Sequence, residues 1–157
     1  MNFVIKLILL TFLSTGNLFS QNTTTSKRLD LFNLDSKNLA IGGYDPVAYF
    51  TKGVATGGNK KYSLTYEGVT YYFSSLKNHA LFEAEPRKYE PQYGGWCAYA
   101  IGDNGEKVSV NPKTFKIVDG KLYLFYNKLF TNTLIPWNED EVNLKNKGDV
   151  FWQQIIK

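Results

Sequence analysis

Few side chains in this sequence can carry metal or nucleophilic chemistry. The chain has one cysteine, Cys97, and one histidine, His79. A thiolate is both a nucleophile and a soft metal ligand, so Cys97 is either a free functional thiol or a small buried side chain. His79 stands one helical turn before Glu83, the spacing of a solvated ion pair, so it is either a surface histidine or a functional one.

Catalysis would have to use these same groups. Cys97 and His79 could act as nucleophile and base of a small thiol-dependent enzyme, and Ser75 lies one turn before His79. The sequence contains no phosphate-binding loop, no paired-histidine motif and no dinucleotide fingerprint. We therefore expect a protein that is not an enzyme.

The stretch from Tyr71 to Cys97 must position these groups. Alternating aromatic and β-branched residues over 62–73, interrupted by Glu67-Gly68, predict a hairpin. Ser74 or Ser75 then caps a helix, which Pro86 ends because proline lacks the backbone donor. The cysteine follows a glycine pair shortly after this helix.

Two further regions have clear local signals. Upstream, Gly42-Gly43 predict a sharp bend, and Asp45 can cap a short turn that begins at Pro46. Downstream, residues 107–110 are predicted to form a short strand, and Asp119-Gly120 suit the type I′ turn of a hairpin over 115–126.

The last thirty residues change to a helical period. Leu129, Thr133 and Trp137 are spaced one turn apart, which predicts a helix interrupted at Pro136. Acids at 139–141 suit the first turn of a following helix, which Lys145, Lys147 and Gly148 are expected to end. A final helical segment carries an apolar stripe of Phe151, Trp152, Ile155 and Ile156.

The N-terminus has the pattern of an export signal. Residues 1–20 contain one early lysine, a short apolar run and small polar residues, which is typical of a secretory signal peptide; a buried core helix is the alternative. The run is too short to span a membrane, so we expect no transmembrane segment in the mature chain. Residues 21–38 form a polar leader that we expect to be partly disordered. These features predict a secreted or periplasmic protein.

Charge and composition limit the other partners. The formal net charge is +4, and lysine and arginine are scattered without a long basic run, so nucleic-acid binding is not expected. A single cysteine cannot form an internal disulfide, so packing must stabilise the fold. The aromatic content of 16% can fill the core of one domain with few large side chains.

Aromatic residues in two glycine-rich segments suggest a second kind of site. Amphipathic rings beside permissive backbone can form a shallow pocket for an apolar or aromatic molecule, although core packing explains the same residues. The candidate ligand-binding residues are Tyr44, Tyr49, Tyr93, Trp96 and Tyr99.

Three blocks of the sequence together resemble the YHS domain family, in its longer secreted bacterial form. The blocks are IGGYDPVAYF at 41–50, YYFSSLKNHALFEAEPRKYEPQYGGWCAYA at 71–100 and PKTFKIVDGKLYLFYN at 112–127. The resemblance implies a small α+β domain. It also implies heavy-metal handling, through cysteines at positions that here hold Asp45, Ser74 and Asn78.

None of these three positions is a cysteine, which removes the thiolates that select copper(I) or zinc. A substituted oxygen, nitrogen and sulfur set, with Asp45, His79 and Cys97 as candidate metal ligands, is one interpretation. The other assigns structural roles to the same positions, with Asp45 and Ser74 as caps and Asn78 as a buried amide bonded to backbone.

The sequence thus predicts an α+β fold, with a small antiparallel sheet of hairpins and several short helices, in a single YHS-like domain over 39–157 with C-terminal helices. The expected function is binding without catalysis, to a small molecule, a metal ion or an envelope protein. The alternatives are a copper or zinc chaperone or sensor with substituted ligands and, less directly, the thiol-dependent enzyme.

Overall fold

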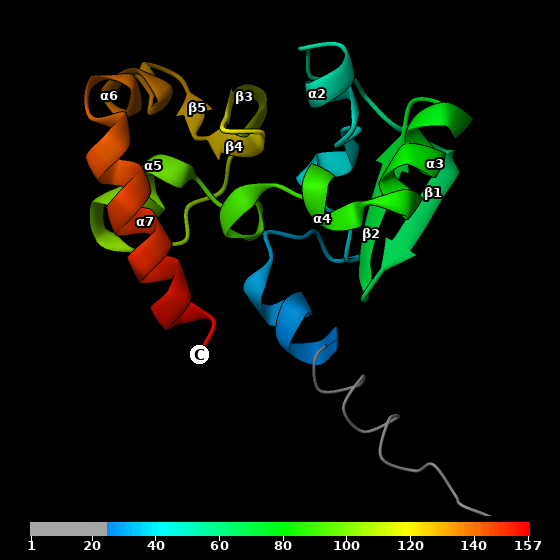
Figure 1. Cartoon of the computed structure of the whole chain (residues 1–157), viewed down its shortest axis with the longest axis horizontal. Coiled ribbons are helices and arrows are strands. Elements are labelled where there is room, and N and C mark those ends of the chain that lie inside the picture. Colours follow the sequence, from blue (N-terminus) through cyan, green and yellow to red (C-terminus); the bar gives the residue numbers. More distant parts are fainter. Residues whose placement is uncertain (1–24) are drawn as a thin grey trace, which may run out of the picture.

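The structure is a computed structural model that describes residues 25–157. The predicted signal peptide and the start of the polar leader lie outside this range. The fold is α+β, as predicted: within residues 25–157, three two-stranded antiparallel sheets are connected by short helices (Figure 1). The hairpins form separate sheets. In the same range no helix is long and apolar enough to cross a membrane.

The first half of the fold lies on the right of Figure 1 and follows the predicted pattern closely. Glu67 and Gly68 have positive φ and form the turn of its hairpin, and the Ser75 hydroxyl caps the next helix by accepting a hydrogen bond from Asn78 N. Its elements are η1 (Ile41–Gly43), α2 (Ala48–Thr51), β1 (Asn59–Tyr66), β2 (Val69–Phe73), α3 (Leu76–Ala84) and α4 (Pro86–Tyr89).

The second half ends in the longest helix of the described range. The predicted hairpin with the Asp119-Gly120 turn is confirmed, and both turn residues have positive φ. Its elements are η2 (Gln92–Gly95), α5 (Ala98–Asn104), β3 (Asn111–Val118), β4 (Lys121–Phe125), β5 (Asn127–Lys128), β6 (Thr131–Asn132), α6 (Leu134–Glu139) and α7 (Glu141–Ile155).

The two halves repeat each other with an offset of 52 residues. Strand β1 at Asn59–Tyr66 corresponds to β3 at Asn111–Val118, and β2 at Val69–Phe73 to β4 at Lys121–Phe125. Both hairpins share one register, with an irregularity after the first pair. The left-handed turn Ile41-Gly42-Gly43 likewise matches Tyr93-Gly94-Gly95. The fold therefore contains a tandem structural repeat, which the sequence patterns above did not predict.

Each half has its own hydrophobic cluster. The first gathers around Tyr71, Phe73 and Phe82 and extends to Leu122 and Leu124 of the second hairpin. The second gathers around Tyr123, Phe125 and Trp137, where the rings of Tyr123 and Trp137 lie 5.5 Å apart. Strand β4 alternates between the two clusters, because successive side chains of a strand point to opposite faces. This strand joins the two halves.

Close helix packing depends on two glycines. A Cβ on Gly102 of α5 would lie 2.4 Å from the carbonyl oxygen of Leu144 in α7, and one on Gly148 would lie 2.7 Å from the Tyr93 hydroxyl. The prediction that α7 ends near Gly148 is therefore wrong. This glycine is the contact point of a helix that continues to Ile155.

The polar leader is more ordered than predicted. Residues 25–31 are helical, and the Arg28 guanidinium lies over the ring of Phe32 at 4.4 Å. Leu29 and Phe32 pack against the first cluster. Burial of these apolar side chains, together with the ion pairs of Arg28, stabilises a segment whose composition alone suggests disorder.

Two local predictions are wrong. Residues 107–110 form no strand, because Val108 O instead accepts a hydrogen bond from Cys97 N. Residues 128–132 are not helical, because Leu129 adopts a left-handed conformation and forms with Phe130 the exposed tip between β5 and β6. The helix begins only at Leu134, whose backbone N–H is bound by the Asn132 side chain.

Candidate functional site

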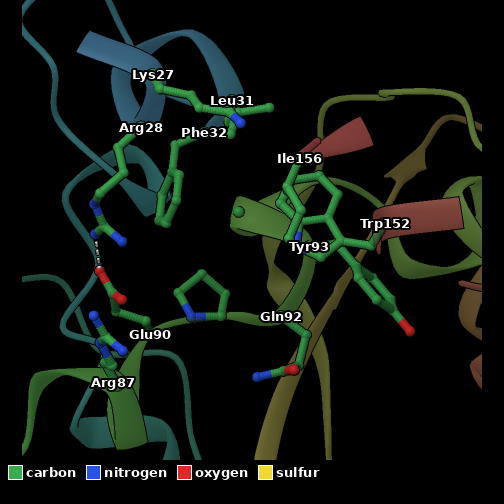
Figure 2. Close-up of a pocket in the computed structure, with 12 residues that line it drawn as sticks. Lys27, Arg28, Leu31, Phe32, Arg87, Glu90, Gln92, Tyr93, Trp152 and Ile156 are labelled. Carbon is green, nitrogen blue, oxygen red and sulfur yellow. Dashed lines mark hydrogen bonds and ion pairs between the residues drawn. The ribbon is translucent and has the colours of Figure 1, made fainter. Parts of the chain in front are cut away.

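A pocket of about 490 Å³ opens where the two halves meet the N-terminal helix. Three segments distant in the sequence line it: 27–32 from that helix, 87–94 from the connection between the halves, and 152–156 from α7 (Figure 2). Phe32 packs against the first hydrophobic cluster. Tyr93 belongs to the second cluster, and Trp152 packs against it. The pocket therefore lies at the seam between two cores.

A left-handed turn shapes the floor of the pocket. Tyr93, Gly94 and Gly95 all have positive φ, which is strained for the tyrosine. Its side chain is held by hydrogen bonds from the hydroxyl to Asp149 Oδ1 at 3.0 Å and to Lys145 O at 3.3 Å, so α7 fixes this conformation. Gly94 allows close approach, because a Cβ there would lie 3.2 Å from Trp152.

Hydrogen bonds from backbone and side-chain donors join the N-terminal segment to this turn. Asn33 N donates to Gly94 O at 2.9 Å, and Asn33 Nδ2 donates to Gly95 O at 3.1 Å. Trp96 Nε1 donates to Leu31 O at 2.6 Å. These bonds fix the helix wall of the pocket relative to its floor.

A buried charged cluster closes one side of the pocket. Glu90 Oε1 accepts hydrogen bonds from Arg28 Nη2 at 2.5 Å and from the Tyr71 hydroxyl at 2.6 Å. Arg28 Nε lies 3.2 Å from Glu67 Oε2, although the angle is too poor for a hydrogen bond. Burial, followed by the negative charge of Glu90 and its hydrogen bond, raises the pKa of Tyr71 well above its usual value. Tyr71 is therefore a neutral donor here.

The structure places only Tyr93 of the five predicted ligand-binding residues on this pocket. Tyr49 is buried and donates to Pro112 O at 2.8 Å, and Tyr44 packs against the first cluster. Trp96 and Tyr99 pack against the second cluster. These four residues therefore do not form a shared pocket with Tyr93.

The three predicted metal ligands do not come together. In residues 25–157 no group of three histidine, cysteine, aspartate or glutamate side chains is arranged to hold a metal ion. His79 lies on α3, 3.9 Å from Glu83 and edge-on to Phe73. Cys97 immediately precedes α5, and Figure 1 shows α3 and α5 on opposite sides of the molecule. The same separation argues against Cys97 and His79 as a catalytic pair.

The positions implied by the family resemblance do converge, as a hydrogen-bond cluster. Asp45 is fully buried, and its Oδ2 accepts hydrogen bonds at 2.7 Å from Ser74 N, Ser74 Oγ and Asn78 Nδ2. Its Oδ1 accepts from Val47 N and Ala48 N. All five groups that contact this carboxylate are hydrogen-bond donors, including the Ser74 hydroxyl and the Asn78 side-chain amide. This donor set does not fit a metal ion. Asp45 caps the turn at Val47 and Ala48, as the structural interpretation predicted. The rest of that interpretation is wrong, because Ser75 and not Ser74 caps α3, and the Asn78 amide bonds the side chains of Asp45 and Ser74 instead of backbone.

Cys97 sits in a similar but weaker cluster. It is fully buried, its Sγ accepts a hydrogen bond from Tyr126 N at 3.4 Å, and Thr133 Oγ1 lies 3.3 Å away. Buried cysteines commonly pack as small apolar side chains. In this environment Cys97 acts as a packed side chain.

These features define a small α+β domain with an interfacial pocket and a buried carboxylate clamp. Residues 47–93 match the family model of the YHS domain. This match lies almost entirely within the first half of the fold and supports the resemblance of that half to the YHS domain family. No curated protein and no solved structure matches the chain.

Proposed function

We propose that this is a secreted or periplasmic binding protein that holds a small organic molecule in the interfacial pocket and catalyses no reaction. The observation that carries the proposal is the pocket itself, whose volume of about 490 Å³ falls within the range of small-molecule sites. Its position between two hydrophobic clusters is also typical of such sites. Export is inferred from residues 1–20.

The lining supports an organic ligand over a bare ion. Apolar and aromatic side chains supply much of the wall, and the charged groups Arg28, Glu90 and Arg87 lie together on one side of it (Figure 2). Burial of apolar surface would drive binding, at about 25 cal/mol for each Å² removed from water. The apolar wall consists of Leu31, Phe32, Pro91, Tyr93, Trp152 and Ile156.

A fluorescent apolar probe tests the proposal. N-phenyl-1-naphthylamine should bind the mature chain with a saturable rise in emission. Leu31→Trp adds bulk to the pocket wall and should weaken this binding, whereas Leu129→Trp places the same bulk at the exposed β5–β6 tip and should not. Absence of saturable binding, or equal binding by both variants, would contradict the proposal. Circular dichroism checks that both variants fold.

A copper or zinc chaperone or sensor is the second candidate, and the YHS match favours it. The hydrogen-bond donors that surround the Asp45 carboxylate argue against a metal ion at that position. Elemental analysis of the exported chain, purified without chelators, distinguishes the two. Stoichiometric metal that is lost in Cys97→Ser or His79→Ala would support the metal function, and its absence at micromolar copper or zinc would support the organic ligand.

A further inference from the structure

The tip of the β5–β6 hairpin presents two large apolar side chains to solvent. The register of the two strands leaves Leu129 and Phe130 as a two-residue turn. Leu129 is 87% exposed, and Phe130 is exposed completely. We propose that this tip inserts into an anionic lipid surface and so attaches the domain to a membrane. The proposal goes beyond the proposed function, because it uses none of the residues that line the pocket.

The backbone of this turn is strained at Leu129. Its φ is 55°, in the left-handed region that glycine, asparagine and aspartate normally occupy in two-residue turns. The base of the hairpin is held in place, because Asn127 Nδ2 donates to Thr114 Oγ1 at 3.0 Å and Asn111 Nδ2 donates to Asn127 O at 3.2 Å. Folding stability alone would favour glycine or asparagine at position 129, and backbone strain of this kind is concentrated in functional segments.

Lysines stand beside the apolar tip. Lys128 directly precedes it and is exposed. Lys113 is also exposed, and it lies in β3 between Asn111 and Thr114, which both bond Asn127 at the base of the hairpin. Within residues 25–157, neither lysine has a carboxylate within 4.0 Å. Both charges are therefore free to attract an anionic surface.

A second exposed loop begins at the same end of the molecule. In Figure 1, the segment that follows α2 begins near the level of β5 and α6, at the end opposite the C-terminus. This segment contains the exposed Lys52 and also Val54, which is 53% exposed. Ile135, in the first turn of α6, is exposed as well. This end of the domain thus combines exposed apolar side chains with lysines on more than one segment.

This composition favours a lipid surface over a protein partner. Lysine is depleted in protein interfaces, and a stable interface buries far more surface than a two-residue turn provides. A bilayer suits the tip, because its interior takes up apolar side chains while anionic head groups attract lysines. Attachment through this end would leave the pocket open to solvent, since the N-terminal helix and the end of α7 lie at the opposite end in Figure 1.

Sedimentation with lipid vesicles tests the proposal. The mature chain should bind vesicles of equimolar phosphatidylcholine and phosphatidylglycerol saturably, and vesicles of phosphatidylcholine alone more weakly. Leu129→Asn/Phe130→Ser should weaken binding at least about tenfold, because it removes the apolar side chains of the tip. Lys128→Gln should weaken binding to the mixed vesicles about fivefold. The control, Val150→Ser, removes an exposed apolar side chain from α7 and should leave binding unchanged.

The stability of the tip variant supplies a second readout. Asparagine tolerates a positive φ, so Leu129→Asn/Phe130→Ser should resist urea at least as well as the wild type while it loses vesicle binding. No saturable binding, undiminished binding by the tip variant, or an equal loss in Val150→Ser would overturn the proposal. Equal affinity for the two kinds of vesicle would overturn the anionic surface. A dimer that only the tip variant abolishes, without vesicle binding, would assign the tip to a protein interface instead.

Discussion

Asp45 and Cys97 occupy equivalent positions in the two halves of the fold, and each side chain accepts a hydrogen bond from the backbone N–H that lies 29 residues further on. Ser74 N donates to Asp45 Oδ2 at 2.7 Å, and Tyr126 N donates to Cys97 Sγ at 3.4 Å. In each half the contact joins the chain after the glycine turn to the end of the hairpin. The carboxylate forms the stronger clamp, since hydrogen bonds to charged groups exceed those to neutral sulfur.

The Asp45 clamp should be important for stability. Asp45→Asn replaces an acceptor by an amide that faces the donors Ser74 N and Asn78 Nδ2, so we expect the free energy of unfolding to fall by about 2–4 kcal/mol. Urea denaturation followed by circular dichroism measures this. Asp103→Asn changes an exposed aspartate on α5 and should have little effect. A stable Asp45→Asn variant would mean that the five contacts contribute little.

The Cys97 thiol should be protected in the native state. It is fully buried, so an aromatic disulfide reagent should label it only as fast as the protein opens. The measurement is the labelling rate in native buffer and in urea. Rapid, stoichiometric labelling of the native protein would contradict the packed position and restore a reactive-thiol function.

The buried Arg28–Glu90 ion pair at the pocket should contribute more to the free energy of unfolding than an exposed ion pair does. Glu90→Gln removes the carboxylate that accepts from Arg28 and Tyr71 and leaves Arg28 paired with Glu67 alone, and we expect a loss of about 2–3 kcal/mol in the free energy of unfolding. Glu85→Gln removes a carboxylate that pairs with Lys88 at 2.8 Å on the surface, and the stability of this variant should remain close to wild type. Equal losses in the two variants would show that burial does not control the effect.

The buried tyrosines should make the folded state less stable at alkaline pH. Burial is the largest cause of the raised pKa of Tyr49, Tyr71 and Tyr93, and it raises the pKa of Tyr123 to about 12. Unfolded tyrosine titrates near pH 10, so above this pH the unfolded state releases protons that the folded state retains. Stability is therefore complete below about pH 10 and falls as the pH rises further.

Equilibrium unfolding between neutral pH and strongly alkaline pH measures this loss. Tyr123→Phe removes one buried phenol, for which no hydroxyl hydrogen bond is found within residues 25–157, so it should flatten the alkaline slope. A stability that is independent of pH above 10 would contradict the burial of these phenols.

The close contact between α5 and α7 at Gly102 should leave no room for an added methyl group. Gly102→Ala would place its Cβ 2.4 Å from Leu144 O, and we expect a loss of about 1–3 kcal/mol through overpacking. Alanine normally favours a helix, so a gain in stability would disprove the close contact. Gly57→Ala is the control, because its Cβ would meet nothing within 4 Å and its φ is not positive.

Local signals in the sequence were sufficient for several elements. The Glu67-Gly68 and Asp119-Gly120 turns predicted both main hairpins, and the pair Ser74-Ser75 predicted the start of α3, which Ser75 caps. Periodicity failed at Leu129 and Phe130, where apolar residues occupy an exposed turn and mimic a helical stripe. The IGGY and YGGW motifs, 52 residues apart, were a signal for the tandem repeat, because each precedes a hairpin whose turn glycine, Gly68 or Gly120, recurs at the same offset.

The pocket could not be predicted in the same way. Tyr93 was a candidate ligand-binding residue, yet its partners Leu31 and Trp152 come from the polar leader and from the last helix. Sequence patterns placed Leu31 in a partly disordered leader and Trp152 on the apolar stripe of a final helical segment. Tertiary contacts bring these segments together, among them those of Asn33 and Gly94, which no local pattern in the sequence reveals.

Chemical-shift mapping with N-phenyl-1-naphthylamine tests binding in the interfacial pocket most directly. The chain has three tryptophans, and their indole N–H signals report three different places. Trp152 lines the pocket, Trp137 is buried in the second cluster, and Trp96 bonds to Leu31 O behind the pocket wall. We predict a saturable shift of the Trp152 and Gly94 signals with Trp137 unchanged. Shifts confined to Leu129 and Phe130, or no saturable shift, would contradict a ligand site at this seam.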